Sequence, residues 1–180
     1  MKKFLLIALA AVTVFACTNK EEEFNKEIQT IIEQNNAVGL AVVAVNNGEV
    51  VYSNTYGYKN LETKEPLKEN DIFRIASISK SFTATAIMQL VEQGKLSLDQ
   101  DVSELVGFSV RKPKYPEKVM TLKMLLSHTS SMNDSNGYFT INAINPDSSA
   151  TWQTAWNSYE PGTGYEYCNL GFNTLGTILE

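Results

Sequence analysis

The chain has very few side chains with which to cross-link itself or to bind a metal ion. Its 180 residues include two cysteines and one histidine, whereas structural zinc sites use four such ligands. Hydrophobic residues make up 43% of the chain, which is enough for a core and too much for a disordered protein. We therefore expect one ordinary domain held together by packing alone, with no disulfide, metal or cofactor.

The charge balance argues against a nucleic-acid partner. Fifteen Lys and Arg residues against twenty Asp and Glu residues give a net charge of −5. Non-specific binding to nucleic acid requires a basic surface that neutralises phosphates. We expect no nucleic acid among the partners.

The first sixteen residues are typical of an export signal. Lys2 and Lys3 precede an uncharged, mostly apolar run at residues 4–16. As a helix this run is about 20 Å long, too short for a hydrocarbon core of ~30 Å. It ends in Val14-Phe15-Ala16-Cys17, which resembles a bacterial lipobox. We predict a signal peptide over residues 1–16 and lipidation of Cys17; the alternative is an ordinary signal peptide with Cys17 as an incidental thiol.

The leader also predicts a location and a domain division. A lipidated protein is held on a membrane of the cell envelope, facing the periplasm or in the outer membrane. Residues 17–37 are interpreted as a solvated tether and a first amphipathic helix, because Phe24, Ile28, Ile31 and Ile32 recur at helical spacing. Residues 38–180 are interpreted as the domain.

Within that domain the pattern predicts an α+β fold. Apolar runs at residues 39–45 and 49–52 flank Asn47-Gly48, the strongest short signal for an antiparallel hairpin. Helical periodicity follows at residues 77–93, where Gly94 is the expected terminator. A short helix after Thr121 and a last helix from Phe172 complete the predicted elements. The polar segments 56–70 and 133–149 are interpreted as connections.

A serine and a lysine stand one helical turn apart at the start of the 77–93 helix. Ser77-Ile78-Ser79-Lys80 is an S-x-x-K motif, and side chains at i and i+3 lie on one face of a helix. A serine hydroxyl becomes a nucleophile when a base takes its proton. A lysine can be that base where its surroundings favour the neutral amine. The alternative is that Ser77 is only the N-cap of the helix.

The bare S-x-x-K pattern occurs a second time, in Ser109-Val110-Arg111-Lys112. Pro113 follows at once and disfavours the helical conformation at Lys112. We interpret Ser109 and Lys112 as loop residues.

Longer segments around Ser77 resemble one enzyme family. Residues 71–84 (DIFRIASISKSFTA), 90–99 (LVEQGKLSLD) and 121–130 (TLKMLLSHTS) are similar to the class C β-lactamase and penicillin-binding serine hydrolase family. The resemblance runs from about Val38 to the end of the chain, and S-x-x-K with downstream partners marks this serine chemistry. It implies a β-lactamase-like fold and an acyl-enzyme formed on Ser77.

The second element of that family is Tyr-x-Asn, which Tyr167-Cys168-Asn169 resembles. The resemblance implies that Tyr167 exchanges protons with the serine and the leaving group, and that Asn169 binds a substrate amide. The alternatives are a core aromatic and a helix cap. Tyr52-Ser53-Asn54 and Tyr58-Lys59-Asn60 also fit the pattern, but they precede Ser77 and are interpreted as sheet and loop residues.

The resemblance also bears on His128, Ser131 and Cys168. The resemblance gives His128, the one histidine, no catalytic role, and we expect it to be buried and hydrogen-bonded. Ser131 stands where the family usually has glycine, although serine resists a positive φ. Cys168 stands where serine is common.

The third motif of the family, Lys-Thr-Gly or His-x-Gly, occurs nowhere in the 180 residues. In the family it lies on a later strand that supplies the second backbone N–H of the oxyanion hole. We therefore expect the N-terminal portion of a longer enzyme, a hairpin plus helices without the C-terminal strands, with little or no turnover as it stands.

The predicted function is a lipid-anchored serine hydrolase of the β-lactamase-related type. Ser77, Lys80, Tyr167 and Asn169 would act on a small-molecule or peptide substrate with an amide, ester or β-lactam carbonyl, as a β-lactamase, a D-peptidase or an esterase does. The alternative is a non-catalytic envelope lipoprotein that binds peptidoglycan-like peptides.

Overall fold

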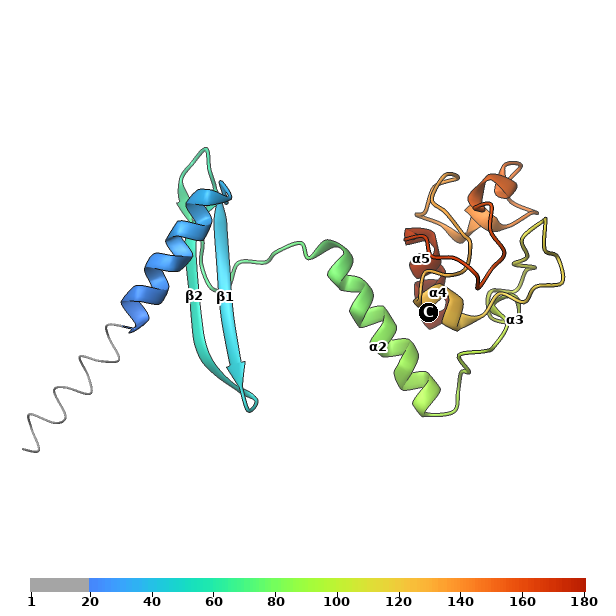
Figure 1. Ribbon diagram of the computed structural model, residues 1–180, viewed down its shortest axis with the longest axis horizontal. Coiled ribbons are helices and arrows are strands. Elements are labelled where there is room, and N and C mark those ends of the chain that lie inside the picture. Colours follow the sequence, from blue (N-terminus) through green and yellow to red (C-terminus); the bar gives the residue numbers. More distant parts are fainter. Residues whose placement is uncertain (1–19) are drawn as a thin grey trace, which may run out of the picture. The chain divides into compact units, whose positions relative to one another are not determined.

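The computed structural model describes residues 20–180, which form two compact units divided after Arg74 (Figure 1). The predicted signal peptide and Cys17 lie outside the described residues, and the predicted domain over residues 38–180 stays a prediction. No helix within residues 20–180 is both long enough and apolar enough to cross a membrane. Each unit is described by itself.

The first unit contains the predicted hairpin. Strands β1 (Gly39–Asn46) and β2 (Glu49–Asn60) pair antiparallel, and a short β3 (Glu65–Pro66) adds to the far edge of β2. Asn47 and Gly48 join β1 to β2 with φ of 50° and 82°, the left-handed pair that a two-residue hairpin turn requires. The Asn-Gly prediction is therefore confirmed.

Strand β2 is longer than expected. Residues 56–60 were predicted to belong to a polar connection, and the structure places them in the strand. Gly57, which suggested a break, has φ of 73° and pairs with Gly39 of β1. A Cβ on Gly57 would lie 2.4 Å from the carbonyl oxygen of Val38, so this glycine permits a close approach between strands instead of ending one.

A helix packs along this hairpin. Residues 20–34 are helical, and Ile28 and Ile32 are buried. The Tyr52 hydroxyl donates to Asn25 Oδ1 (3.0 Å), and the Phe24 and Tyr52 rings meet edge to face at 5.1 Å. The predicted apolar stripe thus covers the hairpin, although its member Ile31 remains half exposed.

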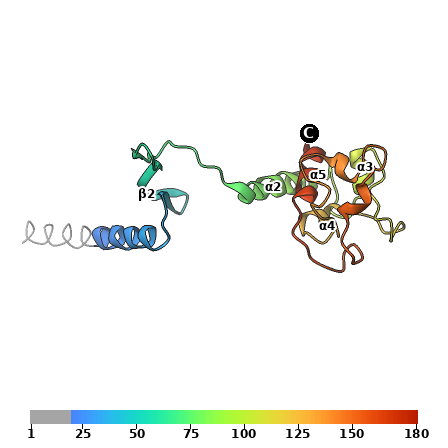
Figure 2. The ribbon, with the colours of Figure 1, turned by 90° about the horizontal axis from the view of Figure 1, so that it is seen from above.

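The second unit is mainly helical. Its helices α2, α4 and α5 gather around one core, in which both α2 and α4 contact α5 (Figure 2). Ile87 of α2, Leu125 of α4 and Leu175 of α5 are fully buried there. The elements in chain order are η1 (Ala76–Ile78), α2 (Ser79–Glu92), α3 (Val102–Val106), α4 (Leu122–Leu126), η2 (Ile141–Ile144), η3 (Trp152–Ala155) and α5 (Asn169–Leu179).

The ends of these helices follow the sequence signals in part. Gly94 has φ of 69° just after α2, and the Thr121 hydroxyl accepts a hydrogen bond from the Met124 N–H (3.3 Å) at the start of α4, as predicted. Two boundaries differ. The segment 133–149, predicted as a loop, contains η2, whose first turn is capped by the Thr140 hydroxyl. Helix α5 begins at Asn169, three residues before the first residue of its apolar stripe.

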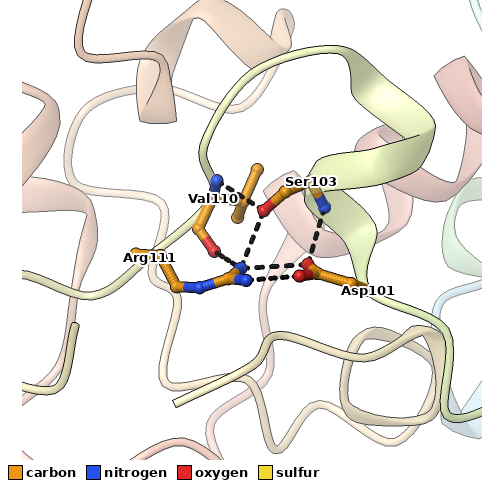
Figure 3. Close-up of polar contacts among 4 residues, drawn as sticks. All are labelled: Asp101, Ser103, Val110 and Arg111. Carbon is orange, nitrogen blue, oxygen red and sulfur yellow. Dashed lines mark hydrogen bonds and ion pairs between the residues drawn. The ribbon is translucent and has the colours of Figure 1, made fainter. Parts of the chain in front are cut away.

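An ion pair fixes the chain around α3 (Figure 3). Asp101 caps this helix by accepting the Ser103 N–H (2.9 Å), and the same carboxylate pairs with Arg111. The Ser103 hydroxyl accepts from both the Arg111 guanidinium (2.7 Å) and the Val110 N–H (2.9 Å). The hydrogen bond from Arg111 holds the pKa of Asp101 below its ordinary value, although burial opposes it. The cap thus remains charged at neutral pH.

A buried lysine joins two loops of the same unit. Lys112 is 3% exposed, and its Nζ donates to Ser131 Oγ (2.9 Å), to the Asn157 carbonyl (2.5 Å) and to the Tyr159 carbonyl. Burial lowers its pKa. Ser131 has φ of 63°, and its hydroxyl also donates to the Tyr159 carbonyl (2.7 Å). The serine that replaces glycine therefore adopts the left-handed backbone and contributes two hydrogen bonds there.

We expect Ser131→Ala to destabilise the second unit more than Ser131→Gly does. Both variants lose the two hydroxyl hydrogen bonds, at about 1–3 kcal/mol, but glycine also relieves the left-handed backbone, worth about 1–2 kcal/mol. Urea unfolding followed by the fluorescence of Trp152 and Trp156 measures this, because both tryptophans of the chain lie in the second unit. A Ser131→Gly variant that is no more stable than Ser131→Ala contradicts the strain argument.

Candidate active site

Ser77 lies in a tight turn at the entry to α2. It is exposed within η1, and the preceding Ala76 has φ of 45°, a left-handed conformation that costs free energy for a residue other than glycine. The caps of η1 and α2 are Ile75 and Ile78. The alternative that Ser77 is the N-cap of its helix is therefore wrong.

Lys80 reaches back to the serine across one turn. Its Nζ donates to Ser77 Oγ (3.1 Å) and also to Asn169 Oδ1 (2.8 Å), on the first residue of α5. Lys80 is half-buried, and its Nζ lies 5.8 Å from the centroid of the Phe172 ring. The i, i+3 spacing thus places the two side chains in contact, and α5 supplies the second acceptor.

Tyr167 approaches the serine from the segment before α5. Its hydroxyl donates to Ser77 Oγ (2.5 Å), and Lys80 Nζ lies 5.0 Å from its ring centroid. The Lys80 side chain is the largest cause that lowers the pKa of Tyr167, and the hydrogen bond with Ser77 adds to it, while burial opposes both. A nearby cation favours the charged phenolate, which is why the pKa of Tyr167 lies below its ordinary value.

The structure therefore brings together all four residues singled out by the S-x-x-K and Tyr-x-Asn motifs. Two segments about 90 residues apart in sequence meet around Ser77 Oγ. The competing matches fall elsewhere. Tyr52 and Tyr58 lie in β2 of the first unit, and Lys112 is engaged with Ser131 and two carbonyls while Ser109 is exposed.

His128 packs against the ring of Tyr167. Its ring lies 4.6 Å from the Tyr167 ring and 5.1 Å from the Phe172 ring, and its Nδ1 accepts the Cys168 N–H (3.1 Å). Burial and then the charge of Lys80 lower its pKa. The residue is hydrogen-bonded as expected, but it is half-buried instead of fully buried. It also adopts φ of 56°, a left-handed conformation that no sequence signal predicts.

One residue of the site, Asp134, belongs to none of the sequence motifs. Its carboxylate accepts hydrogen bonds from the start of α5, including the N–H groups of Asn169 (3.1 Å) and Leu170 (2.9 Å). Burial raises the pKa of Asp134, but these hydrogen bonds outweigh it and the pKa lies below its ordinary value. Asp134 explains why α5 begins at Asn169: a carboxylate from a distant loop caps the helix. No spacing in the sequence links positions 134 and 169.

Cys168, which caps α5 by position alone, is 1% exposed, and burial raises the pKa of its thiol to about 12.

Among the residues that the structure describes, no group of three or more His, Cys, Asp or Glu side chains is placed to hold a metal ion. The cluster around Ser77 is built from a hydroxyl, an amine, a phenol and an amide. This is the side-chain set of a serine nucleophile with proton-transfer partners.

Comparisons with known proteins show the family of the chain. The Beta-lactamase family model matches residues 24–180. Penicillin-binding protein 4* of Bacillus subtilis is 32% identical over 170 residues, which cover 90% of this chain and 36% of that protein.

Solved structures show the same relationship. The octameric penicillin-binding protein homologue from Pyrococcus abyssi aligns with a TM-score of 0.70 at 29% identity, covering 88% of this chain and 38% of that one. A class C β-lactamase in complex with cefoxitin aligns with a TM-score of 0.65 at 27% identity, covering 88% and 43%. The chain thus spans about two fifths of the length of these proteins.

The chain belongs to the Beta-lactamase family. The predicted class, an α+β fold that corresponds to the N-terminal part of a β-lactamase-like domain, is confirmed. Its homologues include penicillin-binding proteins and class C β-lactamases.

We expect His128 to make the second unit less stable as the pH falls. The folded pKa lies below the unfolded value, so stability is full above about pH 6.5 and declines as the pH drops from there toward the folded pKa. A doubly protonated ring cannot accept the Cys168 N–H. Because the chain has one histidine, unfolding measured by tryptophan fluorescence between about pH 7.5 and pH 5 isolates this group from the carboxylates.

His128→Asn is the matched control, because asparagine tolerates the left-handed backbone and does not titrate. The unfolding free energy of this variant is expected to be flat over the same pH range. A wild-type chain that gains stability on acidification from pH 7.5 to pH 5 contradicts the assignment.

Proposed function

We propose that Ser77 is the nucleophile of a serine hydrolase and forms an acyl-enzyme with an amide, ester or β-lactam carbonyl. The observation that carries this proposal is the pair of contacts at Ser77 Oγ, with Lys80 Nζ at 3.1 Å and the Tyr167 hydroxyl at 2.5 Å. Both groups lie within proton-transfer distance of the attacking oxygen. Ser77 is exposed, so a substrate carbonyl can reach it.

The proton balance of the acylation step follows from these contacts. Ser77 Oγ forms a bond to the carbonyl carbon and gives its proton to the Tyr167–Lys80 pair. The pair returns the proton to the departing nitrogen or oxygen as the bond from that atom to the carbonyl carbon breaks. Water then attacks the carbonyl carbon of the ester on Ser77 and gives a proton to the same pair. The bond from that carbon to Ser77 Oγ breaks, the pair returns the proton to Ser77 Oγ, and the acid product leaves.

Lys80 has a second task in this scheme. Its position beside Tyr167 favours the phenolate, which makes the tyrosine a better acceptor for the serine proton. Asn169 keeps capacity for a substrate, because its contacts with Lys80 and Asp134 use only one oxygen lone pair and one N–H of its amide. Asn169 would thus hold the substrate amide with the hydrogen-bonding positions that the protein leaves open.

The comparisons support the class of reaction. The similar proteins are penicillin-binding proteins and a class C β-lactamase crystallised with cefoxitin. The substrate of this chain is proposed only as a small molecule or peptide with an activated or amide carbonyl.

A covalent probe tests the nucleophile. A fluorescent penicillin or a fluorophosphonate is expected to label the chain at Ser77 and to leave Ser77→Ala unlabelled. Tyr167→Phe is expected to slow labelling by ~10²-fold or more, since it removes the proton acceptor. In-gel fluorescence and mass spectrometry of the labelled peptide give the rate and the position.

The matched control is Ser109→Ala, which removes the serine of the second S-x-x-K motif and is expected to label like the wild type. Labelling that survives in Ser77→Ala, or that is lost in Ser109→Ala, contradicts the assignment. A folded chain that binds peptidoglycan-like peptides but never forms the Ser77 adduct favours the alternative, a non-catalytic envelope lipoprotein.

We also propose that the protein is anchored in the cell envelope through lipid on Cys17. The support is the sequence Val14-Phe15-Ala16-Cys17 at the end of an apolar run. More than one acyl chain is needed for stable attachment to a bilayer. Wild-type protein expressed in bacteria is expected to partition into detergent, as is Cys168→Ala, whereas Cys17→Ala is expected in the aqueous phase. Cys17→Ala protein that remains with the detergent contradicts the anchor.

A further inference from the structure

Asp134 contacts both the backbone at the start of α5 and the side chain of Asn169. It belongs to the loop after α4, three residues beyond Ser131, and its carboxylate meets the first turn of α5. Oδ1 accepts from the Leu170 N–H (2.9 Å) and from the Cys168 thiol (3.3 Å). Oδ2 accepts from the Asn169 N–H (3.1 Å) and from Asn169 Nδ2 (2.7 Å).

The contact with Asn169 Nδ2 decides which way that side chain faces. An amide side chain donates at one end and accepts at the other. Because the donating end is bound to Asp134, the accepting end faces Lys80, whose Nζ lies 2.8 Å from Oδ1. The reversed amide would set its oxygen against the carboxylate and its N–H groups against the lysine, and both contacts would be repulsive.

Lys80 depends on this oxygen for one of its two hydrogen bonds. The other goes to Ser77 Oγ (3.1 Å), so the amine is held between Asn169 and the serine. A chain of polar contacts therefore runs from Asp134 through Asn169 and Lys80 to Ser77. The Asp134–Asn169 and Asn169–Lys80 contacts are charge-assisted hydrogen bonds, which are stronger than neutral ones.

We propose that Asp134 is a positioning residue of the Ser77 site: it fixes the amide of Asn169 so that its oxygen holds Lys80 against Ser77 and beside Tyr167. The proposal rests on the proposed function for its meaning in catalysis, but its geometry does not need turnover. A carboxylate that only capped α5 would require the two backbone N–H groups and not Asn169 Nδ2.

A positioning role and a capping role for Asp134 predict opposite changes in the pKa of Tyr167 when Asp134 is replaced. The neighbours that bear on the phenol of Tyr167 are Lys80, Ser77, the neutral ring of His128 and Asp134. Lys80 and Ser77 lower the pKa of Tyr167, whereas the negative charge of Asp134 raises it. Removal of that charge alone would lower the pKa of Tyr167 further, but release of Lys80 would raise it toward its ordinary value of about 10.

The experiment is an NMR titration of the full chain with ¹³C-labelled tyrosine, in which Tyr167→Phe identifies the resonance. Asp134→Asn places a donor opposite Asn169 Nδ2, and the expected result is a higher pKa of Tyr167. Asn169→Ala removes the link and leaves both backbone hydrogen bonds to Asp134 in place, and the same rise is expected. The paired variant Asp134→Asn with Asn169→Asp restores a donor facing an acceptor at both contacts and is expected to bring the pKa back down.

Glu166→Gln is the charge control, because it removes a nearby exposed carboxylate without touching the Asp134–Asn169 contact. It is expected to leave the pKa of Tyr167 at or below the wild-type value. A pKa of Tyr167 that stays the same or falls in Asn169→Ala overturns the proposal, and this variant decides the matter even where Asp134→Asn fails to fold.

Failure of the proposed function gives a different result. If no probe labels Ser77 in the wild type while the pKa of Tyr167 rises in Asn169→Ala, the nucleophile assignment is wrong and the positioning contact stands. If Ser77 is labelled and the pKa does not rise, the positioning role is wrong and the nucleophile assignment stands.

Discussion

The hydrogen bond between Lys80 and Asn169 joins the two segments that form the polar cluster around Ser77. It joins α2 to α5 across 89 positions of sequence. Local geometry alone brings Lys80 to Ser77, since the two residues are a single helical turn apart. Local geometry does not bring Tyr167 there. The tyrosine arrives because α5 packs against α2 through buried residues such as Ile87 and Leu175, and the polar cluster lies at the end of that apolar interface.

The residues that stabilise the second unit and the residues proposed to react lie in different places. The apolar core fixes the two helices and tolerates no buried charge without partners. The reactive side chains lie at its edge, where Ser77 and Tyr167 are exposed and Lys80 is half-buried. Two residues beside the cluster, Ala76 and His128, adopt left-handed conformations. Strained residues persist only where their surroundings determine them fully, which here are the turn into α2 and the aromatic stack of His128 on Tyr167.

The sequence predicts those parts of the molecule that depend on short spacing. Asn47-Gly48 specifies its own turn, Gly94 and Thr121 mark helix ends, and Ser77 with Lys80 share a helix face, all within a few residues. The sequence does not predict what depends on the meeting of distant segments. Gly57 looks like a strand end until its pairing with Gly39 is known. Asp134 looks like an ordinary loop residue until α5 is seen to begin against it. Lys112 looks solvated beside Pro113, yet it is buried because three acceptors from other loops surround it.

The inaccessible thiol of Cys168 makes the chain convenient for spectroscopy. Alkylating reagents react with thiolates, and a sulfur that is 1% exposed with a pKa of about 12 offers almost none at neutral pH. In a variant without Cys17, a cysteine introduced on the surface of the second unit can therefore carry a fluorophore or a spin label without removal of Cys168. Motions of the segment that bears Tyr167 then become observable in a protein whose interior is left intact.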